Sequence, residues 1–226
     1  MGVRERQLRD RESLRRAILD AARELFVAEG YPHVSMRRLA ERIEYSPATI
    51  YGYFESKDAI FFALAEEGFQ LLHQMARSAP PGPRALDTLR NRMWAFYAFS
   101  REHPEYFALM FLDRSVPRIR TDYPRFAHLM AMKGRMADVV EACVAQGDLP
   151  KDLDPMAAFR VLSSALLGVA TARVCERLGP DEDADALARD VLESVLDGLR
   201  TGRGLTFVPS TMETDGPGTA GPFPGA

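Results

Sequence analysis

The chain of 226 residues is 46% hydrophobic and 27% charged, which is ordinary for a soluble globular protein with one large or two small domains. Its formal net charge of −3 would by itself argue against a nucleic-acid partner. The charge is uneven, however, because residues 1–16 carry six arginines against three acidic residues, so basic charge is concentrated at the N-terminal end.

The first segment, residues 1–10, is an arginine-rich arm with two open interpretations. It is either a solvated, frayed start of the chain or a segment that contacts nucleic acid. Over residues 11–29 the apolar side chains, including Leu14 and Ile18, recur at helical spacing, and Gly30 follows directly. This pattern predicts a helix whose apolar stripe faces a core.

Two short helices separated by a tight turn are predicted next. Ser35 is placed to cap the first, and Ser46 is placed to cap the second, over residues 47–54. Glu44 and Tyr45 lie between them. Two short helices joined in this way form a helix-turn-helix, whose second helix enters a DNA major groove.

Several short motifs cluster between Leu14 and Leu64. They are Ala22–Phe26, Gly30–Tyr31, Ser35–Ala40, Ser46–Pro47, Thr49–Phe54 and Lys57. Together they resemble the N-terminal domain of the TetR family of bacterial transcriptional regulators. The resemblance implies an all-α fold, with a three-helix DNA-binding domain followed by a larger helical domain for ligand binding and dimerisation. One departure is Glu44, where the family usually has glycine; a left-handed backbone costs a non-glycine residue about 1 kcal/mol.

The residues expected to contact DNA lie on the two short helices and at the start of the next helix. They are Ser35, Arg37, Pro47, Ala48, Thr49, Tyr51, Gly52, Tyr53 and Lys57. Arg37 suits a guanine edge or a phosphate, and the methyl groups of Ala48 and Thr49 suit a thymine methyl. Gly52 allows close backbone approach, whereas the tyrosine hydroxyls and Lys57 suit phosphates. The resemblance assigns the same work to these positions.

The remainder of the chain is predicted to be helical as far as residue 201. The predicted helices cover residues 57–76, 84–102, 104–112, 124–147, 155–178 and 183–201. From Gly202 the chain is rich in small and turn-forming residues and is expected to be disordered. We therefore predict a DNA-binding domain over 1–56, an effector-binding and dimerisation domain over 57–202, and a disordered tail over 203–226.

Bulky apolar side chains are frequent in the predicted second domain. They are most simply core residues, but methionine and aromatic side chains also suit an adaptable pocket. The resemblance implies a pocket for a small effector, here expected to be apolar. The candidate lining residues are Trp94, Tyr97, Phe107, Met110, Phe111, Phe126 and Met130, with Met132 in the same pattern.

The last two predicted helices combine small residues with leucines, which suits close helix packing. The resemblance implies a dimer formed by a four-helix bundle from these two helices of each subunit. The candidate interface residues are Val161, Ala165, Gly168, Ala172, Leu192, Val195, Leu196 and Leu199. A core within one chain is the alternative for the same residues.

The sequence carries no recognisable catalytic or metal motif. It lacks a nucleophile elbow, a phosphate-binding loop, a dinucleotide fingerprint and an HExxH pair. Cys143 and Cys175 have no CxxC spacing and are both expected to be buried in a reducing cytosol. Because no apolar run approaches eighteen residues and no signal peptide precedes the first helix, a cytoplasmic protein without membrane contact is expected.

These observations predict a homodimeric, sequence-specific DNA-binding regulator that is not an enzyme and needs no cofactor. The preferred mechanism is a repressor released from double-stranded operator DNA by a small apolar effector. The alternatives are an α-helical interaction protein without specific DNA binding and a transcriptional activator of the same fold.

Overall fold

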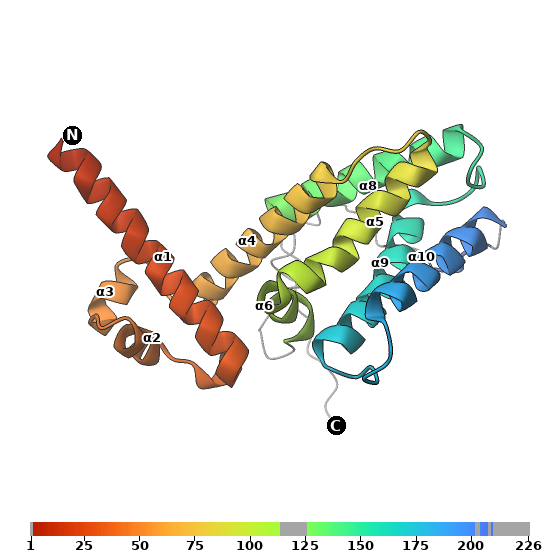
Figure 1. Cartoon of the computed structure of the whole chain (residues 1–226). Coiled ribbons are helices and arrows are strands. Elements are labelled where there is room, and N and C mark those ends of the chain that lie inside the picture. The colour runs from red at the N-terminus through yellow and green to blue at the C-terminus, as the bar shows by residue number, and fades with distance from the viewer. Residues whose placement is uncertain (1, 114–125, 202–203, 208, 210–226) are drawn as a thin grey trace, which may run out of the picture.

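Two groups of helices meet along one long helix in the computed structural model, which describes residues 2–113, 126–201, 204–207 and 209 (Figure 1). Helices α1, α2 and α3 form the N-terminal group, and α5, α8, α9 and α10 pack side by side in the C-terminal group. Helix α4 runs from one group into the other. Every regular element in the described part of the chain is helical, so the predicted all-α fold is confirmed.

Helix α1 spans Val3–Glu29 and is longer than predicted. The expected start near Arg11 was wrong, because residues 3–10 continue the helix instead of forming an irregular arm. These residues include arginine, glutamate, glutamine and leucine and contain neither proline nor glycine, so nothing in them interrupts the helix. The helix ends at Gly30, whose φ of 80° suits glycine.

The helices of the helix-turn-helix begin where predicted, but the second ends at Tyr51 instead of residue 54. The 3₁₀ turn η1, Tyr31–His33, leads into α2, Met36–Arg42, and then α3, Pro47–Tyr51. Ser35 accepts a hydrogen bond from the Arg38 amide, and Ser46 accepts one from the Thr49 amide, at 3.2 and 3.1 Å. These two contacts confirm both predicted caps.

The turn between α2 and α3 takes a left-handed backbone at Glu44, with φ of 60°. The Tyr45 amide then donates to the Ala40 carbonyl over 2.9 Å and closes the end of α2. A glutamate therefore occupies the left-handed conformation that favours glycine, as expected from the resemblance, since the family usually has glycine at this position.

Helix α4, Lys57–Ser78, begins at a third capping serine, Ser56, and ties the two helix groups together. Its fully buried Ile60 and Leu64 belong to one continuous apolar core that also includes Ile50 of α3 and Leu89 of α5. The same core therefore extends through both groups of helices.

The C-terminal group is built from the remaining helices. They are α5 (Ala85–Glu102), α6 (Pro104–Phe107) with the π-helical turn η2 (Ala108–Leu112), α8 (Ala127–Ala145), α9 (Pro155–Val174) and α10 (Ala184–Arg200). Helix α8 is shorter than the predicted 124–147, because it begins at Ala127, with Phe126 as its N-cap, and ends at Ala145. Nearly all of the tail 203–226 lies outside the described residues.

Helix α9 ends earlier than predicted. The expected end at Leu178 was wrong, because the helix stops at Val174 and Glu176 adopts a left-handed backbone with φ of 51°. Helix α9 is long and apolar enough to cross a membrane, with a mean hydropathy of 1.4. The core helices of soluble proteins can have the same length and composition. No membrane-crossing segment was predicted from the sequence.

The two cysteines occupy different environments. Cys143 of α8 is fully buried, as expected, and burial raises the pKa of its thiol to about 11. Cys175 at the end of α9 is exposed, so the expectation that both thiols are buried was wrong. The early end of α9 explains the difference, because Cys175 caps the helix instead of lying within it.

Candidate functional site

The surface of α3 is almost wholly available to a partner. Ser46, Pro47, Ala48, Tyr51 and Gly52 are exposed, and Thr49 is partly exposed. The helix is only five residues long and is held by the fully buried side chain of Ile50. Because so short a helix has little stability of its own, the core contact fixes its orientation while its polar face remains free to read DNA.

Arg37 of α2 is strongly exposed, with 83% of its side chain accessible to solvent. Its Nε donates to Glu41 over 2.9 Å, one helical turn away. The neighbouring arginines have structural partners in α1, since Arg38 pairs with Glu29 and Arg42 with Glu24. Arg37 thus has the geometry of a side chain that can exchange a weak surface ion pair for a base or phosphate.

The hydroxyl groups of the helix-turn-helix already serve its own structure. The Thr49 hydroxyl lies 2.9 Å from that of Ser46, which also caps α3. Ser35 is likewise the N-cap of α2. Both serines lie at the exposed N-terminal ends of their helices. The partial positive charge of a helix at this end attracts phosphate.

The side chain of Lys57, which was predicted to contact a phosphate, binds within its own chain. Its Nζ donates to the Tyr31 carbonyl over 2.7 Å and sits 4.1 Å from the centre of the Tyr31 ring. Burial and the hydrogen bond from Tyr31 to Asp58 raise the pKa of the Tyr31 hydroxyl. Lys57 therefore joins the start of α4 to η1. Its contact with DNA remains a prediction.

Tyr53 also packs inside the N-terminal group. It is partly buried, and the Arg11 guanidinium lies 5.9 Å from the centre of its ring. Tyr51, in contrast, has 55% of its surface exposed. Tyr51 is therefore better placed than Tyr53 to reach a partner outside the chain.

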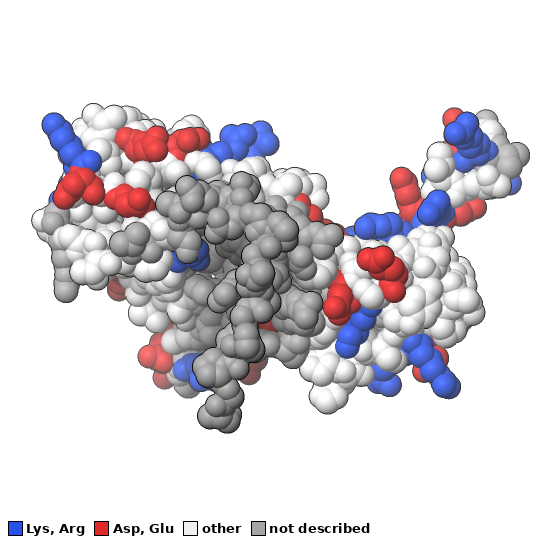
Figure 2. Space-filling view, turned by 180° about the vertical axis from the view of Figure 1, so that it is seen from behind, with Lys and Arg blue, Asp and Glu red and all other residues white. Residues whose placement is uncertain are grey.

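Sequence reasoning missed one candidate on this surface. Tyr45, directly before the Ser46 cap, is 50% exposed. An aromatic residue in a two-residue turn beside a helix cap was an available signal, because a buried role is difficult there. The N-terminal end of α1 projects from the body of the molecule and carries arginine side chains (Figure 2).

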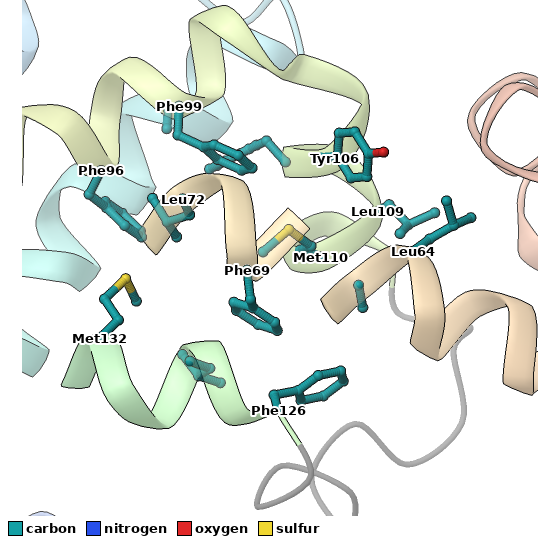
Figure 3. Close-up of a cluster of buried hydrophobic side chains, with 14 of the residues drawn as sticks. Leu64, Phe69, Leu72, Phe96, Phe99, Tyr106, Leu109, Met110, Phe126 and Met132 are labelled. Carbon is teal, nitrogen blue, oxygen red and sulfur yellow. The ribbon is translucent and has the colours of Figure 1, made fainter. Parts of the chain in front are cut away.

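A cavity of about 190 Å³ lies in the C-terminal group, between α5, α8, α9 and η2. Figure 3 shows Phe69, Phe96, Met110 and Met132, which all line it, gathered in this part of the core. Of the predicted pocket residues, Met110 and Phe111 line the cavity, and Met132 joins them. The side chain of Phe69 reaches it from α4, which places α4 in contact with both the cavity and the DNA-binding helices.

The other predicted pocket residues do not line this cavity. Phe107 is fully buried behind Phe111, and Phe126 packs on Phe69 with ring centres 5.0 Å apart. Met130 is partly exposed on α8. Their role in effector binding remains untested.

Trp94 and Tyr97 face α10 instead of the cavity. The Tyr97 hydroxyl donates to Asp185 over 2.8 Å, and burial together with this hydrogen bond raises the pKa of Tyr97 to about 12. Arg189 lies 4.9 Å from the centre of the Trp94 ring. Both aromatic residues thus hold α5 against α10.

Four polar residues in the cavity wall were missed by the sequence analysis. They are Lys133 of α8 and Arg160, Ser163 and Ser164 of α9. The available signal was a group of polar residues within one turn of an otherwise apolar helix.

The predicted dimer residues divide into two sets. Val161, Ala165, Ala172 and Val195 are partly exposed and Gly168 is exposed, so they form an outer face of α9 and α10. Leu192, Leu196 and Leu199 are buried within the single chain. The outer set is available to a second subunit, whereas the three leucines pack in the core of their own subunit.

An exposed helix-turn-helix joined by one long helix to a helical domain with an internal cavity defines a DNA-binding transcriptional regulator of the two-domain, all-α class. Residues 18–64 match the family model of bacterial regulatory proteins of the tetR family, and residues 89–195 match that of the tetracyclin repressor-like C-terminal domain. The chain belongs to the TetR family of transcriptional regulators.

Individual relatives agree with this assignment. The HTH-type transcriptional regulator TcmR of Streptomyces glaucescens is 28% identical over 210 residues, covering 88% of this chain and 87% of TcmR. The HTH-type transcriptional repressor Rv1474c of Mycobacterium tuberculosis is 44% identical over 62 residues, which cover 27% of this chain and 33% of that protein.

A solved structure shares the fold. The transcriptional regulator FadR of Bacillus subtilis, in complex with stearoyl-CoA, superimposes with a TM-score of 0.68 at 20% identity. The match covers 80% of this chain and 97% of FadR.

Proposed function

We propose that this protein is a homodimeric repressor that leaves its operator when a small molecule occupies the cavity of the C-terminal group. The observation that carries the proposal is the position of α4. Its Ile60 and Leu64 pack in the core that supports α3, and its Phe69 lines the cavity. A ligand that displaces Phe69 therefore acts on the same rigid element that orients the DNA-reading helices.

Two contacts add a second connection between the cavity side and the N-terminal helices. Arg16 of α1 pairs with Glu67 of α4 over 2.6 Å, and Arg23 of α1 donates to the Tyr106 hydroxyl of α6 over 3.1 Å. We place the boundary between the two domains near residue 56, directly before α4, and assign residues 57–202 to the effector-binding domain.

The outer face of α9 and α10 suits a second copy of the chain. Only 39% of the residues in the most apolar stretch of α9 are buried within the single chain. On α10, Val191 and Val195 are partly exposed and Leu187 is 40% exposed, one helical turn apart. Burying these apolar residues against their copies would form the four-helix bundle expected for the family.

The relatives support the two finer points of the proposal. Rv1474c is described as a repressor, and the FadR structure holds stearoyl-CoA, so members of this fold combine DNA binding with small-molecule binding. Operation in the cytoplasm follows from the proposed contact with chromosomal DNA. A shift from 99% bound to 99% free protein takes a preference of the ligand for the DNA-incompetent form of about 10⁴-fold, or ~5.5 kcal/mol, and smaller shifts take less.

The first test concerns DNA binding and the direction of control. The full chain should shift the DNA upstream of its own gene in a gel, and a reporter under that DNA should rise when the regulator is deleted. Loss of reporter expression on deletion would make the protein an activator. Failure to bind any upstream fragment would favour the alternative of an interaction protein without specific DNA binding.

The second test concerns the dimer. Gly168→Glu places a charge on the outer face of α9, where an added side chain meets nothing within 4 Å in the single chain. We expect a folded monomer by sedimentation and loss of operator binding, because two recognition helices must reach half-sites about one turn apart. Gly134→Glu on α8 is the matched control, since Gly134 is equally unobstructed and exposed. A dimeric Gly168→Glu protein would place the interface elsewhere.

A further inference from the structure

One face of α1 changes its chemistry along the helix. Ile18 and Ala22 are fully buried on this face and belong to the core. Toward the N-terminus the face continues, at helical spacing, with exposed residues: Arg15, Arg11, Leu8 and Arg4. We call these four residues the arginine face. The stripe that anchors α1 in the core therefore becomes a basic surface near the end of the helix.

Contacts with the segment after α3 show which way the arginine face points. The guanidinium carbon of Arg11 lies 5.9 Å from the centre of the Tyr53 ring, and that of Arg15 lies 5.2 Å from the centre of the Phe54 ring. Tyr53 and Phe54 directly follow α3 and its C-cap. The face is therefore on the side of α1 that carries α3, and α1 extends past α3 toward the N-terminus (Figure 1).

The acidic residues of this part of α1 lie on other faces. At 3.6 residues per turn, Glu5, Asp10 and Glu12 are turned by about 70° or more from the centre of the arginine face. Arg6 is turned by about 170° and lies on the opposite side of the helix. The arginine face thus presents three positive charges and no negative charge toward the side of α3.

This arrangement of charge is unfavourable for an isolated helix. Arg4 lies in the first turn of α1, where the positive end of the helix dipole disfavours a cation. Arg11 and Arg15 are four residues apart, a spacing at which like charges destabilise a helix. An anion that lies against the face offsets both effects. The phosphates of DNA are such anions and follow one another along each strand.

We propose that the arginine face binds backbone phosphates of the DNA that flanks the base pairs read by α3. The inference rests on the proposed function, because it extends the same operator contact. The match to the family model of the DNA-binding domain begins at residue 18, so this contact lies ahead of the matched region. Residues 3–10 add about 12 Å of helix, which equals the length of three to four base pairs along the DNA axis.

A membrane surface is another polyanion that a basic helix can bind. A helix that lies in a membrane interface needs a large apolar face opposite its charges. Of the four residues in the arginine face only Leu8 is apolar, and it lies among the arginines instead of opposite them. The position of the face beside α3 also favours DNA, because a duplex that contacts α3 brings its flanking phosphates to the same side of the molecule.

The test compares two single substitutions in the full-length protein. Arg4→Gln removes a charge from the arginine face, and Arg6→Gln, the matched control, removes the same charge from the opposite side of the same helical turn. The probe is the fragment upstream of its own gene that the unchanged protein binds. Hydroxyl-radical footprinting measures the length of protected DNA, and fluorescence anisotropy at several salt concentrations measures affinity.

Arg4→Gln should shorten the footprint at its flanks, weaken binding several-fold and reduce the magnitude of the logarithmic salt slope by about one per subunit. Arg6→Gln should leave all three unchanged. Arg11→Gln should act in the same direction as Arg4→Gln, and thermal unfolding checks that it remains folded without its contact to Tyr53. Altered flanking base pairs should not change the affinity of the unchanged protein, because phosphate contacts carry no direct sequence information.

Three outcomes would overturn the inference and leave the proposed repressor intact. They are a full footprint in both Arg4→Gln and Arg11→Gln, equal losses in Arg4→Gln and Arg6→Gln, and an unchanged footprint in Arg4→Gln with loss of its binding to phosphatidylglycerol vesicles. The last outcome would place the face on a membrane surface. An unchanged protein that binds no upstream fragment would contradict the proposed function and the inference with it.

Discussion

Arg23 of α1 donates a hydrogen bond to the Tyr106 hydroxyl of α6 over 3.1 Å, and its guanidinium carbon lies 5.3 Å from the centre of the same ring. Met110, one turn beyond Tyr106, lines the cavity. The pair therefore links α6, which leads into the cavity wall, to the helix that supports the helix-turn-helix.

Tyr106→Phe should weaken the coupling between effector and DNA. It removes the hydrogen bond and keeps the ring, so the loss corresponds to about 0.5–1.5 kcal/mol, or roughly two- to tenfold in the coupling factor. The measurement is the ratio of operator affinities with and without a saturating effector. Tyr97→Phe, which acts between α5 and α10, should leave that ratio unchanged. Equal effects of the two variants would contradict a specific role for Tyr106.

Arg37→Ala and Lys57→Ala should separate DNA reading from internal structure. Arg37 is exposed, so its removal should change stability by less than about 0.5 kcal/mol and cost about 1–3 kcal/mol of operator affinity at particular base pairs. Lys57→Ala should lower the free energy of unfolding by about 1–3 kcal/mol, because the Tyr31 carbonyl loses a charged donor.

Denaturant unfolding and salt-dependent DNA titrations distinguish the two roles of Lys57. A phosphate contact would reduce the magnitude of the logarithmic salt slope by about one, whereas a purely structural role would leave it unchanged. An unstable Arg37→Ala protein would show that its surface ion pair with Glu41 matters more than its geometry indicates.

Two helical glycines should respond oppositely to alanine. A Cβ at Gly68 of α4 would overlap Met110 Sδ and lie 3.1 Å from a ring carbon of Tyr106, so α4 and the cavity wall approach closely only because this residue is glycine. Gly68→Ala should destabilise by about 1–3 kcal/mol and weaken effector binding as Met110 shifts. Gly134→Ala meets nothing within 4 Å and should stabilise by about 0.5–1 kcal/mol. Thermal unfolding with effector titration measures both.

His73 of α4 should make stability depend on pH. It is 9% exposed, and its buried Nε2 has no hydrogen-bond partner among the described residues. Burial, followed by the positive charges of Arg135, His128 and Arg77, lowers its pKa. The unfolded chain therefore binds the proton more readily, and the stability that His73 contributes is full above about pH 6.5 and lost as the pH falls toward the lower folded-state pKa.

His73→Gln should reduce this loss of stability between pH 7 and pH 5. The free energy of unfolding from urea titrations at several pH values is the measurement. His33→Gln, at an exposed position in η1, serves as the control. An unchanged pH profile in His73→Gln would show that another group dominates.

The two thiols should react at different rates. With an aromatic disulfide reagent at pH 8, Cys175 should react at once, because it is exposed. Cys143 should react only after unfolding, since burial raises its pKa to about 11 and blocks access. Cys175→Ser should abolish the fast phase. Two fast thiols in the native protein would indicate that α8 opens readily.

Local features of the sequence determined where the helices of the helix-turn-helix begin and where its turn lies. Ser35, Ser46 and Ser56 each bond an amide three residues ahead, and the left-handed turn lies at Glu44. Such contacts involve neighbours in the chain, so their spacing is sufficient to predict them. Asp154 caps α9 in the same way, and the start of that helix was predicted correctly.

Only the tertiary structure decided what each side chain meets. Leu192 and Val195 were equivalent by spacing, yet Leu192 is buried in its own chain and Val195 is partly exposed. Lys57 could have faced DNA, but the Tyr31 carbonyl, 26 residues earlier, lies within its reach. Lys133 was not among the predicted pocket residues, yet it is buried and lies in the cavity wall. These partners lie far apart in the chain and are brought together by helix packing, which helical periodicity alone does not specify.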